Sequence, residues 1–220
     1  MCLKILSFFL PWPLRRKLLN KAFKYQIHPS AKIGLAWVFP KKLTMAEGSA
    51  IGHFTTAVHL DEIVLNKYSK IGRSNWITGF PSGTKSPHFK HQQNRASRLV
   101  VGEHSAITKN HHIDCTSSIH IGRFTTIAGY YSQLLTHSID IIEGRQDSAP
   151  IHIGDFSFVG TNVVLLGGAV LPDYSVLGAK SLLNKAFDQV YMLYGGVPAK
   201  PLQPLPQDAK YFTRSTGFVI

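Results

Sequence analysis

His137 is the residue best placed to act as a general base in this chain of 220 residues with eleven histidines. The unperturbed pKa of an imidazole suits proton abstraction near neutral pH. His137 stands in Thr136-His137-Ser138, at the start of a segment without periodicity and beside the most regular part of the chain. The sequence offers four candidates for an orienting partner of the second ring nitrogen and does not rank them: Gln133, Asp140, Glu143 and Asp114.

The sequence gives less support for a metal site or for a covalent nucleophile. His88 and His91 have a spacing that could bind a metal on a helix, but no acidic or cysteine partner accompanies them, so a solvated loop and no metal are expected. The two cysteines, Cys2 and Cys115, are far apart and belong to no metal or redox motif. Cys115 is expected to pack inside the fold, and a reducing cytoplasm is the default compartment.

The elements that must position His137 repeat every six residues. From Ile153 to Gln189 an aliphatic residue opens each six, and a small residue or Val stands near the fifth place. The opening residues are Ile153, Val159, Leu165, Leu171, Leu177 and Leu183. Neither a helical period nor simple alternation gives this register, whereas a parallel β-helix with three flat faces does. The sequence therefore predicts an all-β solenoid whose stacked coils bury the aliphatic columns.

Weaker sixes precede this region, and two segments interrupt them. They begin at Ile27, Ile33 and Phe39, lapse over 80–98, resume from Val101, and lapse again over 133–150. A bulged corner is expected at Thr116-Ser117-Ser118, where the phase slips by two. We predict a helical cap over 1–26, a β-helix domain over 27–200 with projecting loops at 80–98 and 133–150, and a C-terminal tail over 201–220.

The N-terminus and the charge favour a cytoplasmic protein with a basic surface. The apolar run Ile5 to Leu10 is too short to span a bilayer, and the positive charges follow it instead of preceding it as in a signal peptide. A basic amphipathic helix over Leu14 to Tyr25 either caps the solenoid or contacts an anionic membrane. The net charge of +12 serves solubility or attracts an anionic ligand. No nucleic-acid-binding module is visible, so nucleic acid is not expected as a partner.

From about Val101 to Leu202 the pattern resembles the left-handed β-helix, hexapeptide-repeat acyltransferases, in particular galactoside and maltose acetyltransferases and O-acetyltransferases of polysaccharide gene clusters. Thr108-Lys-Asn-His-His-Ile-Asp-Cys and Thr136-His-Ser-Ile-Asp are similar to the polysaccharide-associated branch. This resemblance implies acetyl transfer from acetyl-CoA to a sugar hydroxyl in a ternary complex. It also implies His137 as base, with Asp114, Gln133 and Thr136 supporting the site or the acceptor, and a homotrimer with shared sites.

The same resemblance implies a coenzyme A groove on the last coils. Val159-Gly-Thr-Asn, Leu177-Gly-Ala-Lys-Ser-Leu-Leu-Asn-Lys and Gly196-Val-Pro-Ala-Lys are similar to family motifs. The residues they place at the groove are Phe158 as an apolar wall, Thr161, Ala179, Asn184, Lys185 and Lys200. Lys180 in place of a Gly and Lys200 in place of an Arg depart from the family pattern.

Several alternatives stay open. His112 either touches the acceptor sugar or hydrogen-bonds within the His137 site, and His111 or His112 is equally consistent with an ordinary corner residue. γ-Class carbonic anhydrases share the fold and bind zinc through three histidines, but their His-x4-His pair is missing here. A non-catalytic solenoid for assembly or glycan binding is the third reading.

Overall fold

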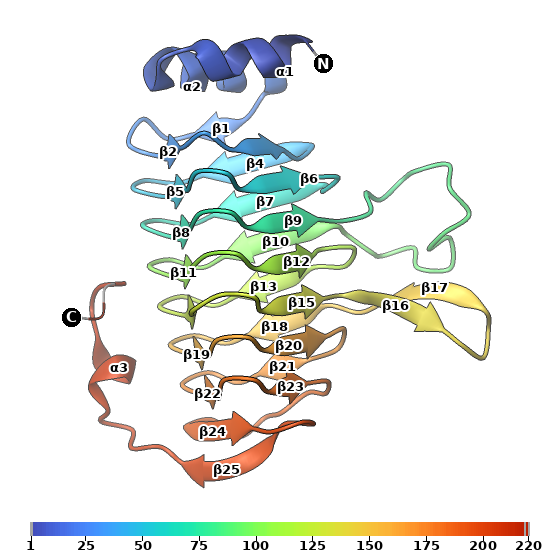
Figure 1. Cartoon of the computed structure of the whole chain (residues 1–220), viewed down its shortest axis with the longest axis vertical. Helices are drawn as coiled ribbons and strands as arrows, with labels where there is room; N and C mark the ends of the chain where they lie inside the picture. The colour runs from blue at the N-terminus through green and yellow to red at the C-terminus, as the bar shows by residue number, and fades with distance from the viewer. Residues whose placement is uncertain (1, 218, 220) are drawn as a thin grey trace.

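The computed structural model describes residues 2–217 and 219 and shows a three-sided prism of stacked parallel strands (Figure 1). Face 1 consists of β1 (Gln26–Ile27), β4 (Lys42–Met45), β7 (Glu62–Leu65), β10 (Arg98–Val101), β13 (Ile119–Ile121), β18 (Ile151–Ile153) and β21 (Val170–Leu171). Face 2 consists of β2 (Lys32–Ile33), β5 (Ala50–Ile51), β8 (Lys70–Ile71), β11 (Ala106–Ile107), β14 (Thr126–Ile127), β19 (Phe158–Val159), β22 (Val176–Leu177), β24 (Met192–Gly195) and β25 (Lys200–Pro204). Face 3 consists of β3 (Trp37–Phe39), β6 (Thr56–Val58), β9 (Trp76–Thr78), β12 (His112–Asp114), β15 (Gln133–Leu135), β20 (Val164–Leu166) and β23 (Leu182–Leu183).

The predicted register of six builds the core and confirms the β-helix. Each opening aliphatic pairs with its counterpart in the next coil, as Val159 does with Ile127 and with Leu177. These side chains are fully buried and form one continuous cluster. The small residues at the fifth place, such as Ser157 and Ser175, are also buried, because the chain must turn tightly there.

One early position was predicted wrongly. Val38, and not Phe39, stands in the inward column of face 3, where it pairs with Ala57. Phe39 instead packs outside the column against Phe23 and Trp37, with ring centroids 5.6 and 4.9 Å apart. The aromatic ring is needed there because the N-terminal helices cover this end of the prism.

The N-terminal residues form three helical segments at the start of the prism, α1 (Cys2–Leu6), η1 (Ser7–Phe9) and α2 (Trp12–Phe23). Arg15 is buried and donates to the carbonyls of Gly34 and Ala36 at 2.9 and 3.1 Å. Trp12 Nε1 donates to Ala31 O at 3.0 Å. The helices thus satisfy carbonyls that the first coil would otherwise expose. No helix in the described part of the chain combines the length and apolarity needed to cross a bilayer.

Two segments project from the same edge of the prism, between face 3 and face 1 (Figure 1). The first is the loop between β9 and β10. The second is an antiparallel hairpin of β16 (His137–Asp140) and β17 (Arg145–Ser148). The hairpin starts four residues later than the predicted 133–150, because Leu134 stacks between Ile113 and Leu165 inside the prism. Leu134 follows Ile127 by seven residues instead of six. Because of this one extra residue, the period of six did not reveal the coil.

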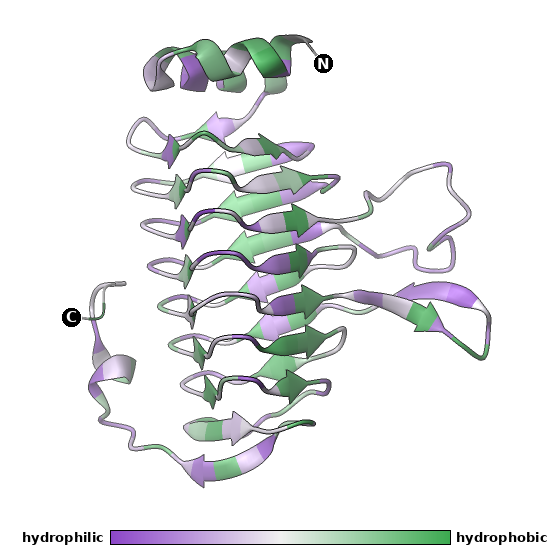
Figure 2. Cartoon of the chain, in the orientation of Figure 1, coloured by the Kyte–Doolittle hydropathy of each residue, from purple (hydrophilic) through white to green (hydrophobic). Residues whose placement is uncertain are grey.

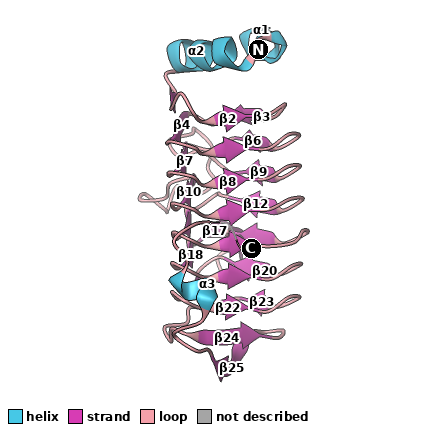
Figure 3. Ribbon diagram, turned by 90° about the vertical axis from the view of Figure 1, so that its left-hand side faces the viewer, coloured by secondary structure: helices cyan, strands magenta, loops and turns pink. Residues whose placement is uncertain are grey.

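The C-terminal part adds one more layer than the sequence predicted. Tyr194 in β24 occupies the inward column below Leu177 and is fully buried, so an aromatic ring replaces the expected aliphatic. β25 then runs antiparallel to β24, and α3 (Lys210–Thr213) lies against the side of the prism (Figure 3). Tyr211 fixes it there by donating to Ser157 O at 3.0 Å.

A column of stacked aromatic rings follows the corner between face 1 and face 2. Neighbouring centroids lie 4.7–5.3 Å apart with interplanar angles of 5–21°. All six residues have a left-handed backbone, with φ between 52° and 57°. The members of this aromatic ladder are Tyr68, His104, Phe124, Phe156, Tyr174 and Tyr191. Since each pair contributes about 0.5–1.5 kcal/mol beyond burial, the ladder offsets the backbone strain at this corner.

We expect Phe156→Ala to lower the free energy of unfolding by about 2 kcal/mol, because the substitution removes two stacked pairs and keeps the left-handed backbone. Phe156→Gly should lose about 1 kcal/mol less, since glycine relieves that strain. Phe54→Ala is the matched control: its φ is 60° and its ring is 71% exposed, so the change should stay under about 0.5 kcal/mol. Urea unfolding measures all three, and an equal loss for Phe54→Ala would contradict a stabilising ladder.

Candidate functional site

His137 and Asp114 form the centre of the site at the edge from which the two segments project. His137 Nδ1 lies 3.3 Å from Asp114 Oδ2, and the backbone N–H of His137 donates to the same oxygen at 3.1 Å. The imidazole is 44% exposed and the carboxylate 11%. A proton on Nδ1 donated to Asp114 leaves the lone pair on Nε2, so the ring can accept a proton from a bound group.

The predicted bulged corner holds the carboxylate in place. Asp114 Oδ1 accepts from the backbone N–H and the hydroxyl of Thr116 at 3.2 and 2.7 Å. Thr136 Oγ1 is buried, donates to Asp114 O at 2.8 Å and accepts from Ser117 N at 2.9 Å. Of the four partners that the sequence left open, the structure thus brings Asp114 to His137, and Thr136 supports the pair.

The other predicted supporting residues lie elsewhere. His112 and Gln133 pair with each other at the starts of β12 and β15, at the opposite end of face 3 from His137. Both are exposed, so neither is an ordinary buried residue. Asp140 stabilises the hairpin turn by accepting from the backbone N–H groups of Ile142 and Glu143 at 3.1 Å.

Three residues of the first loop complete the surroundings of His137, and sequence reasoning missed them. The ring of Phe89 is 7% exposed and meets the imidazole edge to face, with centroids 6.2 Å apart. Arg95 lies 4.6 Å over Phe89 and donates to the carbonyls of Phe80 and Thr116. Gln92 joins the loop to the hairpin through Asp147 and Ser148. The sequence signal in this loop was the spacing of His88 and His91. The residue that reaches the imidazole of His137 is Phe89, which lies between them.

The described residues contain no group of three or more His, Cys, Asp or Glu side chains arranged to hold a metal ion. His91 Nε2 lies 3.7 Å from Asp147 Oδ1. His88 meets the ring of Phe80 edge to face at 6.0 Å. Both histidines therefore belong to the contacts of the loop and the hairpin. Cys115 is free and buried, and burial raises the pKa of its thiol well above the usual value.

Thr161 and Ala179, the predicted pantetheine contacts, lie on the corner between face 2 and face 3. Thr161 Oγ1 accepts from Tyr130 N and donates to Tyr130 O, both at 3.1 Å. A Cβ at Gly160 would come within 2.6 Å of Ala179 N, so this corner is closely stacked. Within one chain this corner precedes the face 3 strands, whereas His137 follows the end of a face 3 strand. Thr161 and Ala179 therefore do not contact His137 of the same chain.

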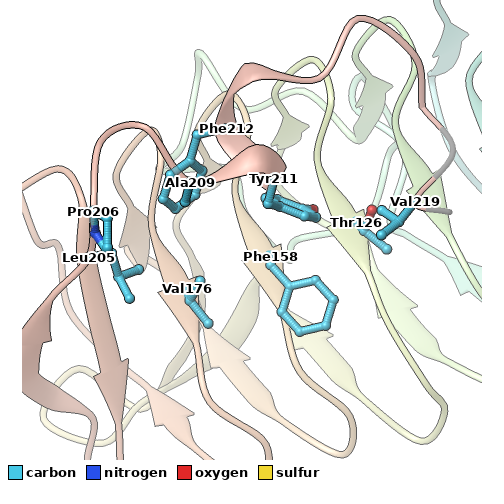
Figure 4. A pocket seen from close by; sticks show the side chains of 9 residues that line it. All are labelled: Thr126, Phe158, Val176, Leu205, Pro206, Ala209, Tyr211, Phe212 and Val219. Carbon is cyan, nitrogen blue, oxygen red and sulfur yellow. The ribbon is translucent and has the colours of Figure 1, made fainter.

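The other residues predicted to contact coenzyme A lie on different surfaces of the chain. Asn184 and Lys185 follow β23 on the same edge as His137, two coils further on, with Lys185 Nζ 5.1 Å over Phe187. Lys200 is exposed in β25 opposite Gly195. Phe158 lies on the outside of face 2 under α3, where Tyr211 meets its ring at 5.8 Å. It lines an apolar cavity of about 480 Å³ there (Figure 4).

The comparisons identify the fold. No protein-family model matches the chain, and no curated protein sequence matches it. Among solved structures, the polysialic acid O-acetyltransferase OatWY aligns over 82% of this chain and 84% of its own, with TM-score 0.60 and 16% identity. The chain has the left-handed β-helix fold of the hexapeptide-repeat acetyltransferases. The hexapeptide-repeat-containing acetyltransferase VCA0836 from Vibrio cholerae aligns over 93% of this chain and 88% of its own, with TM-score 0.53 and 19% identity. Its complex with acetyl coenzyme A gives TM-score 0.50 over 93% and 84%, again at 19% identity.

His111, one of the two histidines left open by the sequence, is a buried corner residue of this β-helix. Its Nδ1 accepts from Ser132 N at 3.1 Å and its Nε2 lies 3.0 Å from Thr108 Oγ1. Burial disfavours the charged ring and lowers the pKa of His111 to about 4.

This pKa predicts a loss of stability on acidification. Between pH 6.5 and about 4 the unfolded chain binds a proton at His111 and the folded chain does not, so stability falls as the pH falls through that window, by about 3 kcal/mol at most. Urea unfolding at pH 7 and pH 4.5 measures the slope, and His111→Gln should make it shallower. An identical slope in both proteins would show that His111 does not couple folding to pH.

Proposed function

We propose that this protein is an acyl-CoA-dependent O-acyltransferase that transfers an acetyl group from acetyl-CoA to a sugar hydroxyl in bacterial polysaccharide biosynthesis. The single observation that carries the proposal is the pairing of His137 with Asp114 at the edge of a hexapeptide-repeat β-helix. Among the structural neighbours, VCA0836 and OatWY are acetyltransferases, the first also solved in complex with acetyl coenzyme A and the second named for polysialic acid. They support the reaction class and suggest a glycan acceptor.

In this mechanism His137 is the general base and Asp114 is its positioning residue. Nε2 takes the proton of the sugar hydroxyl while the hydroxyl oxygen attacks the thioester carbonyl. The tetrahedral intermediate then expels the coenzyme A thiolate, which takes the proton back from the imidazolium. A ternary complex of this kind needs no covalent enzyme intermediate, in agreement with the burial of Cys115.

We further infer a homotrimer in which neighbouring subunits share each site. In one chain the Thr161 and Ala179 corner and His137 lie at opposite ends of the face 3 strands, and a neighbouring copy can bring the two edges together. Thr161 and Ala179 would then contact the pantetheine arm, and Lys185 and Lys200 the nucleotide phosphates as point charges. Asn184 stands beside Lys185. For Phe158 a role as groove wall requires α3 to move.

His137→Gln should lower the rate of acetyl transfer by about 10²–10⁴-fold, the usual contribution of a general base, without changing the affinity for acetyl-CoA. His28→Gln is the matched control, because His28 is exposed beside the first strand of the prism and its ring contacts Ser30, away from Asp114. Thiol release measures turnover, and a thermal shift with acetyl-CoA measures binding. Near-normal turnover of His137→Gln would remove His137 from this role.

We also infer that the N-terminal cap contacts the inner face of the membrane from the cytoplasm. Its apolar side chains are exposed: Leu3 43%, Ile5 46%, Leu6 60%, Phe9 81%, Leu10 36% and Leu14 53%. Figure 2 shows hydrophobic residues along these helices, and Lys17, Lys21 and Lys24 are exposed on α2 and its end. Apolar side chains beside lysines are typical of helices that lie on anionic lipid.

Phe9→Asp should therefore reduce flotation with phosphatidylglycerol vesicles several-fold, because it places a charge where the most exposed apolar ring of the cap would enter the lipid. Phosphatidylcholine vesicles should bind little of either protein. Phe54→Asp makes the same substitution at an exposed phenylalanine on the prism and should float like the wild type. Flotation of Phe9→Asp at the wild-type level would eliminate this contact.

A further inference from the structure

A cavity of about 330 Å³ lies between the first loop and the hairpin. Phe89, His88 and His91 line it from the loop, and Ile139, Arg145 and Gln146 line it from the hairpin. Figure 1 shows the two segments projecting side by side, and Gln92 connects them. Gln92 Nε2 donates to Asp147 Oδ1 and Ser148 O at 2.6 and 2.7 Å, and its Oε1 accepts from Ser148 Oγ at 2.6 Å. The cavity thus has two walls held together by specific hydrogen bonds.

The cavity shares one face of the hairpin with His137. In the antiparallel register His137 pairs with Ser148 and Ile139 pairs with Gln146, so these four side chains point to the same side. Arg145 pairs with Asp140 on the other side and lines the cavity next to the hairpin turn, beside Gly144. Phe89 bridges the two places, because it contacts the imidazole and lines the cavity. Ile139 is two residues beyond His137, which corresponds to roughly 7 Å along a strand. A group bound in the cavity would therefore lie within reach of a molecule whose hydroxyl is at His137, but it would be a different part of that molecule from the hydroxyl that reacts.

The charges around the cavity favour an anion. Arg145 is the permanent cation of its lining, His88 and His91 add ring N–H donors, and no acidic side chain lines it. The segment 80–98 carries four Lys or Arg and no Asp or Glu. Two carboxylates form ion pairs at the border of the cavity: Asp140 Oδ2 lies 3.8 Å from Arg145 Nε, and Asp147 Oδ1 lies 3.7 Å from His91 Nε2. Neither is within hydrogen-bond distance of these nitrogens, so Arg145 retains donors for a ligand.

We propose that this cavity binds a carboxylate-bearing sugar unit linked to the sugar that is acylated at His137, an inference that rests on the proposed function. A planar guanidinium matches a carboxylate with two parallel hydrogen bonds. Phe89 and Ile139 provide apolar contacts for the ring of the same unit. The acceptor is then an acidic oligosaccharide, and the two projecting segments select it by charge.

The test compares acidic tetrasaccharides with their carboxyl-reduced counterparts, which differ only in having a primary alcohol at each former carboxylate. Galacturonate, hyaluronan and sialate tetramers serve as probes, and calorimetric titration measures Kd. We expect at least one acidic tetramer to bind about tenfold or more tightly than its reduced form, the range of a hydrogen bond to a charged group. Arg145→Gln and, separately, His88→Gln should weaken that preference, Arg145→Gln to within about threefold.

Arg73→Gln is the matched control, since it removes the same charge from an exposed residue on another corner, and it should keep the preference. Unchanged melting temperatures confirm that each variant is folded. The proposal is overturned if no acidic tetramer is preferred, or if both Arg145→Gln and His88→Gln keep the full preference. If thiol release is equally fast with acidic and with reduced acceptors, the proposed carboxylate site is contradicted and the proposed transferase activity is not. A carboxylate preference without any thiol release from acetyl-CoA refutes the transferase instead.

Discussion

The vertical register of the coils is the constraint on which the rest of the structure depends. Each inward aliphatic stacks on its equivalent one coil away, and the parallel hydrogen bonds repeat with the same spacing. This register sets Asp114 opposite Leu135, so that the chain leaving the prism at Thr136 passes directly over the carboxylate. A slip of one residue would turn Leu134 outward and separate the imidazole from Asp114. The buried columns therefore determine the geometry of the exposed pair.

The regular prism and the irregular segments have separate tasks. The prism provides rigid edges with exposed corners, and the segments provide the side chains that surround His137. Neither segment is held by the prism alone: Gln92 joins them to each other, and Arg95 joins the first one to the corner at Thr116. A site built in this way keeps the half-exposed imidazole of His137 in a fixed orientation while its surroundings vary with the loops.

The sequence predicted those features that repeat and missed those that occur once. The period of six gave the three faces, the buried columns and the two interruptions, because each coil imposes the same demand on its residues. The sequence did not predict three inward positions, Val38, Leu134 and Tyr194. At the first two the corner is one residue shorter or longer than the period of six, and at the third an aromatic residue replaces the expected aliphatic. Phe89, Gln92 and Arg95 could not be found, since their partners lie in another segment and no spacing relates them. The aromatic ladder was readable in principle, at the third corner residue of successive coils.

We propose that catalysis takes place between subunits, and mixed trimers test this proposal most directly. His137→Gln lacks the proposed base, and Ala179→Asp places a charge where the pantetheine arm of acetyl-CoA would lie. If one subunit provides His137 and its neighbour provides Ala179, random mixing of the two inactive variants by refolding should restore about a quarter of the sites, because each required partner is present with a probability of about one half. Restored thiol release near this level would support the shared site. Continued inactivity of trimers that are shown to be mixed would contradict it and place the whole reaction in one chain.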